Sequence, residues 1–146
     1  MTKDEQETQS QKVVIVPCSG IGKTYGSVSR EAAFELVEDL RADETQLVAL
    51  SLLVLGDEAS LSAVKGSPAI TIDGCKLACA KKMVQESGGA VARDFSVLDV
   101  YRRYKQFKPQ GIAELDEGGR NLASALAAEL AEIVDEMVGG ENGRSA

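Results

Sequence analysis

The chain holds three cysteines and no histidine, and this combination restricts the chemistry open to it. Cys18 follows a short apolar run, and Cys75 and Cys79 form a C-x-x-x-C pair further along the chain. Without histidine, a Ser-His-Asp or Cys-His mechanism is excluded, and so is an imidazole metal ligand. The three thiols remain as candidate metal ligands, reactive groups or small buried side chains.

Cys18 lies inside VVIVPCSGIGKTYG, residues 13–26, whose second half is similar to the end of a phosphate-binding P-loop. A P-loop needs Gly, four residues, then Gly-Lys-Ser/Thr leading directly into a helix. Pro17 stands where the first glycine belongs, and two residues separate Thr24 from the predicted helix. The sequence therefore disfavours a nucleotide-hydrolysing site.

The same glycine-rich turn keeps a weaker interpretation open. Free backbone amides between a strand and a helix can bind an anion, with Gly20, Gly22 and Lys23 as the candidate contacts or as groups around a metal ligand. A tight turn without any ligand is a comparably supported interpretation.

The apolar patterns predict strands and helices in alternation. Short β-branched runs bounded by turn residues indicate four strands, at 13–17, 46–51, 68–74 and 90–97. Apolar residues at helical spacing indicate helices at 27–40, 75–89, 98–107 and 120–138. These alternations predict a three-layer α/β fold, with a mainly parallel sheet of about four strands, helices on both faces and a C-terminal helix.

The chain is expected to form one α/β domain over 13–138, with a disordered tail at 1–12 and a frayed tail at 139–146. The final helix carries an apolar stripe, which we expect to pack back on the sheet; a face for a protein partner or a homodimer is the less favoured alternative. The residues of this stripe are Leu122, Leu126, Leu130, Ile133 and Met137.

Charge and hydropathy exclude several classes of partner. The net charge of −7 argues against nucleic acid and anionic membranes, since both need clustered Lys and Arg. The sequence contains neither a long apolar run nor the apolar core of a signal peptide, so we expect a cytoplasmic protein. Thiols in that reducing compartment are seldom paired in disulfides.

The predicted fold brings two cysteines toward one edge. Cys18 and Cys75 each follow a predicted strand, and the carboxyl ends of parallel strands share the edge where ligands bind. A helix starting at Cys75 would place Cys79 on the same helix face one turn later. A shared metal or redox site and separate structural thiols both remain open.

These segments carry a resemblance to a known family. VPCSGIGKTYGSVSREAA, with IDGCKLACAKK downstream, resembles the DGC-domain family, named for its Asp-Gly-Cys motif and described as zinc-binding. The resemblance extends over about Val13 to Lys108. Its motifs are specific in combination and much less so singly.

The resemblance implies zinc bound by Cys18, Cys75 and Cys79, with an iron–sulfur cluster as the less favoured cofactor. The family has a further middle cysteine, where this chain has Ser51. A serine hydroxyl is a poor zinc ligand, so three thiolates would leave a fourth position for water, a substrate or Asp73. As the Asp of an Asp-Gly turn, Asp73 is favoured as a helix cap rather than as a ligand.

Three functions are therefore weighed. The first is a zinc protein that acts as a sensor, carrier or accessory protein. The second is a thiol enzyme for sulfur or alkyl transfer, with Cys18 or Cys75 as nucleophile and Cys79 resolving. The third is an interaction protein whose cysteines are inert.

Overall fold

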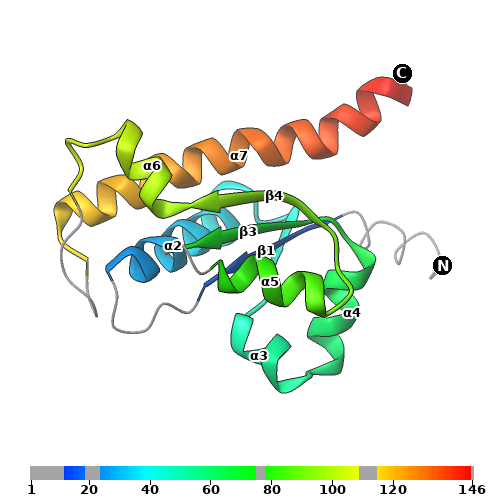
Figure 1. Ribbon diagram of the computed structural model, residues 1–146. Helices are drawn as coiled ribbons and strands as arrows, with labels where there is room; N and C mark the ends of the chain where they lie inside the picture. The colour runs from blue at the N-terminus through cyan, green and yellow to red at the C-terminus, as the bar shows by residue number, and fades with distance from the viewer. Residues whose placement is uncertain (1–11, 19–23, 75–77, 109–114, 146) are drawn as a thin grey trace.

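A computed structural model describes residues 12–18, 24–74, 78–108 and 115–145, with side chains up to residue 138. Four parallel strands form one sheet in the order β2-β1-β3-β4 (Figure 1). Residues 1–11, nearly all of the predicted tail, lie outside the described part. The strands are β1 (Val13–Pro17), β2 (Thr45–Leu47), β3 (Ala69–Asp73) and β4 (Val91–Ser96).

The two central strands are the apolar runs that most clearly predicted a parallel sheet. Every residue of β1 and of β3 is buried, and Ile15 pairs with Ile70 in their parallel register. Strands covered on both faces need such continuous apolar sequence. The edge strand β4 is more exposed and tolerates the charged residues Arg93 and Asp94.

Helices cover both faces of the sheet, as predicted. One face carries α2 (Thr24–Phe34), the π-helix η1 (Glu35–Leu40), α6 (Val97–Arg103) and α7 (Glu117–Ser145). The other face carries α3 (Leu50–Leu55), α4 (Glu58–Gly66) and α5 (Cys79–Glu86). Alternate residues of β1 enter the two cores, with Ile15 on the α2 side and Val16 on the α5 side, which confirms the three-layer architecture (Figure 1).

The second predicted strand is corrected. The sequence predicted strand up to Ser51, but β2 ends at Leu47 and helix α3 begins at Leu50. A continuous apolar run does not distinguish strand from helix, and the decisive signals come after it. Gly56 ends α3 in the left-handed conformation at φ 79°, and Asp57 caps α4 by accepting the N–H of Ser60.

Helix α7 packs on α2 and η1, within the core that also contains β1 and β3. Its predicted stripe is buried at Leu122, Leu126 and Leu130, which confirms the expected packing of this helix in the core. The helix is longer than the predicted 120–138. It starts earlier because Asp116 accepts the N–H of Gly119, and it continues through 139–145, the residues expected to fray.

A surface ion pair connects the end of η1 to α7. Arg41, at the end of η1, donates two hydrogen bonds of 2.7 Å to the carboxylate of Asp135. That pairing holds the pKa of Asp135 below its ordinary value, opposed only in part by loss of solvent. In the part of the chain that the structure describes, no helix combines the length and apolar character needed to cross a membrane.

Replacement of Leu126 by Ala tests how much α7 contributes to the core. Leu126 is fully buried, so Leu126→Ala should lower the free energy of unfolding by about 2–5 kcal/mol in urea denaturation. Leu55→Ala is the matched control, because Leu55 is 80% exposed and its loss should cost less than about 0.5 kcal/mol. Equal effects of the two changes would contradict the packing of α7.

Candidate functional site

The candidate site lies where the chain changes sides of the sheet. After β1 the chain enters α2 on one face, and after β3 it leads to α5 on the other. Because β1 and β3 are adjacent, their carboxyl ends form a topological switch point, where open α/β sheets bind ligands. Cys18 and Gly74 are the first residues after these two strands.

Cys18 is fixed in place by backbone and side-chain contacts. Its N–H donates to the carbonyl of Ile72 at 2.8 Å, which extends the β1–β3 ladder by one residue. Its Sγ accepts the N–H of Gly74 at 3.1 Å and lies 3.5 Å from Oγ of Ser29. The side chain is only 6% exposed, so the sulfur points into the protein with its contacts preformed.

Gly74 is required by the close approach of two backbones. A Cβ at this position would lie 2.8 Å from N of Gly26 and 2.9 Å from C of Tyr25, both in the first turn of α2. Only glycine fits against these atoms. The glycine of the Asp-Gly-Cys motif therefore lets β3 and α2 meet, and it directs an N–H at Cys18.

Asp73 is the helix cap that the sequence favoured. Its Oδ1 accepts the N–H of Ala80 at 2.8 Å and its Oδ2 that of Lys81 at 3.3 Å, so both carboxylate oxygens are directed to the start of α5. Burial of this 4% exposed residue raises its pKa, and the two backbone hydrogen bonds oppose that shift. The carboxylate is already engaged in holding α5.

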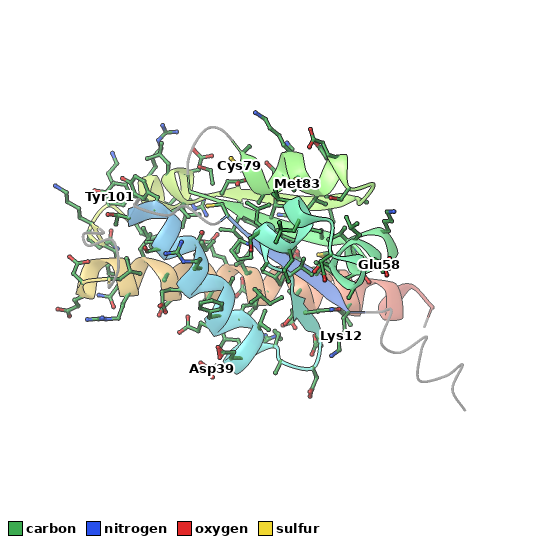
Figure 2. All side chains as sticks on the ribbon, turned by 90° about the horizontal axis from the view of Figure 1, so that it is seen from below. Lys12, Asp39, Glu58, Cys79, Met83 and Tyr101 are labelled. Carbon is green, nitrogen blue, oxygen red and sulfur yellow. The ribbon has the colours of Figure 1, made fainter. Side chains whose placement is uncertain are left out.

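The start of α5 differs from the prediction. Helix α5 begins at Cys79 and not at Cys75, because Ala78 adopts the left-handed conformation at φ 53° and interrupts any helix before it. Cys79 is therefore the first residue of α5, and it does not lie one turn inside the helix as predicted. Cys79 is exposed, and Figure 2 shows it near the rim of the molecule.

Several candidate residues lie outside the described part of the chain: Cys75, Gly20, Gly22 and Lys23. Among the described residues, no three His, Cys, Asp or Glu side chains gather as a metal site, and Cys75 is not among those residues. The structure thus places Cys18 beside Gly74, the residue that precedes Cys75 in sequence. It leaves the contacts of Cys75 as a prediction.

One argument against the P-loop is also corrected. Helix α2 begins at Thr24, so no residues separate Thr24 from the helix, contrary to the sequence prediction. Gly26 belongs to this added turn, and its carbonyl accepts a hydrogen bond from Oγ of Ser29. The mismatch with a P-loop now rests on Pro17, which ends β1.

Cys18 also lines a cavity of about 280 Å³ together with Ser51. The cavity lies beyond the carboxyl ends of β1 and β2, between α2 and α3. The sequence analysis did not identify Arg30 and Phe34 as residues of this site. Their spacing of four residues, in the predicted helix after the glycine-rich turn, indicates that both lie on one helix face. The lining residues are Pro17, Cys18, Arg30, Phe34, Leu47, Ala49, Leu50 and Ser51.

Substitution of Gly74 tests the close approach of β3 and α2. Gly74→Ala should cost about 1–3 kcal/mol of stability, since the added methyl group meets backbone atoms that cannot turn away. Gly66→Ala is the control, because a Cβ there meets nothing within 4 Å. Thermal or urea unfolding measures both, and similar stabilities for the two variants would refute the close approach.

Loss of the Asp73 carboxylate should loosen α5. Asp73→Ala should lower the free energy of unfolding by about 1–2 kcal/mol, the usual cost of losing a cap, and Asp73→Asn by less because one acceptor oxygen remains. The matched control is Asp43→Ala, at an exposed position. An Asp73→Ala protein as stable as the control would mean that the cap is not needed.

The raised pKa of Asp73 gives this cap a defined pH dependence. A carboxyl group whose pKa is higher in the folded state than the ordinary 3.8 stabilises the fold most at pH values below 3.8. This stabilisation is lost as the pH rises through the folded pKa. The stability of the native protein relative to Asp73→Asn should therefore fall as the pH rises from about 3.8 through the folded pKa of Asp73. Urea denaturation across this range checks the sign, and a rising difference would contradict it.

The comparison with known proteins addresses the family. The DGC domain family matches residues 14–118, more than half of the chain, and the match includes Cys18, Ser51 and the Asp-Gly-Cys segment. No curated protein and no solved structure matches. With the family match over both motifs, the resemblance seen in the sequence is confirmed, and the chain belongs to the DGC domain family.

Proposed function

We propose that this protein binds one zinc ion through the thiolates of Cys18, Cys75 and Cys79 and acts as a metal sensor, carrier or accessory protein. Membership of the DGC domain family supports a metal-binding role in general. The observation that supports this site is the contact of 3.1 Å between Sγ of Cys18 and N of Gly74, the residue before Cys75. It brings the two cysteine-bearing segments together.

The chemistry of the described donors fits a thiolate-bound metal. Thiolates are the soft ligands that suit Zn²⁺, at about 2.3 Å from the metal. The N–H of Gly74 directed at the Cys18 sulfur is the kind of outer contact that orients and stabilises a metal-bound sulfur. Four residues separate Gly74 from Cys79 in the sequence; Gly74 contacts Cys18, and the start of α5 is held by Asp73.

Two features define the fourth position of such a centre. Both oxygens of Asp73 accept N–H groups of α5, so this carboxylate supports the site instead of completing it. Ser51 lines the same cavity as Cys18, which supports an open fourth position on the side of the family's missing cysteine. Water or an external ligand would fill it.

The thiol-enzyme alternative receives less support. Cys18 lines the cavity, but it is only 6% exposed and its sulfur is already engaged by the N–H of Gly74 and by Oγ of Ser29. Cys79 is exposed. The chain has no histidine, and no carboxylate or lysine in the described part of the chain is hydrogen-bonded to Cys79 as a base. Inert cysteines remain the outcome that the following experiment would reveal.

Metal analysis of untagged protein, purified without added metal, tests the proposal. We expect about one equivalent of zinc per chain, lost in Cys18→Ser and in Cys75→Ser. Ser62→Cys is a control for added thiols, since Ser62 is exposed on α4. Less than about half an equivalent, with all three native thiols freely alkylated, would overturn the zinc assignment.

Restoring the missing cysteine tests the fourth position. Ser51→Cys should raise zinc affinity by about tenfold or more in competition with a chromophoric chelator, because a fourth thiolate closes the site. The Ser62→Cys protein should keep the native affinity. Equal affinities in the two variants would show that Ser51 does not occupy the place of the family's middle cysteine.

A further inference from the structure

The cavity lined by Cys18 and Ser51 adjoins the proposed metal centre, and its other six lining residues have no part in that centre. Its volume of about 280 Å³ corresponds to about nine water molecules, and so to a ligand of roughly that many non-hydrogen atoms. It opens at the carboxyl edge of β1 and β2, where Pro17 and Leu47 are the last strand residues. Ligands of open parallel sheets bind at this edge.

The wall of the cavity is apolar with a small polar part. Pro17, Phe34, Leu47, Ala49 and Leu50 contribute the apolar surface, and Arg30, Cys18 and Ser51 contribute the polar atoms. Such a lining, with few polar groups among apolar ones, is typical of small-molecule sites. The wall favours a ligand whose larger part is hydrocarbon.

Arg30 gives the cavity its charge. Among the residues described as lining it, Arg30 is the one that carries a charge, in a protein whose net charge is −7. Its Nη2 donates a hydrogen bond of 3.1 Å to Oγ of Ser27, which is buried in α2, and this contact fixes the guanidinium at the wall. A guanidinium pairs best with a planar carboxylate, to which it can donate two parallel hydrogen bonds.

We infer that this cavity binds a small monocarboxylate with an apolar tail, the carboxylate at Arg30 and the tail against Phe34, Leu47 and Leu50. A single guanidinium balances one negative charge, so a dianion such as phosphate would bring an uncompensated charge into an apolar site. A neutral molecule of the same size would gain no ionic interaction with Arg30. The inference stands on the cavity and does not depend on zinc.

Hexanoate is a suitable probe, with hexan-1-ol as the uncharged analogue. In a ¹H–¹⁵N NMR titration with a chelator present, hexanoate should shift the amides of Arg30 and of residues 47–51, with at least about tenfold higher affinity than hexan-1-ol. The chelator prevents a metal ion from holding the carboxylate. Equal affinity of the two probes, or shifts confined to another surface, would overturn the inference.

Three variants localise the binding. Arg30→Gln should weaken hexanoate binding at least about tenfold. Ser27→Ala, which removes the Arg30–Ser27 hydrogen bond but keeps the guanidinium, should weaken it less than about threefold. Ala49→Phe should abolish binding by filling the cavity, and the exposure of Ala49 makes this change compatible with the fold.

Each variant also has an outcome that contradicts the inference. A loss in Ser27→Ala as large as in Arg30→Gln would mean that the intramolecular bond, and not a contact with the ligand, sets the affinity. Unchanged binding in Ala49→Phe would place the ligand outside the cavity. The folded amide spectrum of each variant, recorded before the titration, verifies that these effects concern the site.

Discussion

The approach of Gly74 to Cys18 and to the first turn of α2 is the constraint on which this site depends. The N–H of Gly74 donates to Sγ of Cys18 at 3.1 Å. Because Gly74 has no Cβ, the backbone of Gly26 can pack against it; a Cβ at this position would lie only 2.8 Å from N of Gly26. The carboxyl ends of β1 and β3 are thereby locked together at the point where the chain leaves for opposite faces.

The first two residues of the Asp-Gly-Cys motif have different physical roles. Asp73 sets the start of α5 through two backbone hydrogen bonds, and Gly74 makes room for α2 and orients Cys18. These two residues prepare the ends of a short segment that carries Cys75 in between. Cys79, the second cysteine of the motif, begins α5 directly after Ala78, which adopts the left-handed conformation.

Much of the fold could be predicted because the central strands are continuous apolar runs and the C-terminal helix has a clear stripe. The predictions failed where neighbours far away in sequence decide the local structure. Leu50 and Leu53 are buried against the α5 face, which makes α3 a helix although its sequence also suits a strand. The sequence favoured Asp73 as a helix cap but predicted the helix start at Cys75, whereas α5 begins at Cys79 and Asp73 accepts the N–H of Ala80. Arg30 belongs to the cavity only because β2 and α3 lie opposite α2.

The central claim, that Cys18 and the Asp-Gly-Cys segment hold one metal ion, is tested most directly by X-ray absorption spectroscopy at the zinc edge of the purified protein. The account predicts about three sulfur neighbours at about 2.3 Å and one lighter atom in the fourth position. Loss of about one sulfur neighbour in Cys18→Ser, with α5 unchanged, would agree with it. A first shell of nitrogen and oxygen alone, or a sulfur count that Cys18→Ser leaves unchanged, would contradict it.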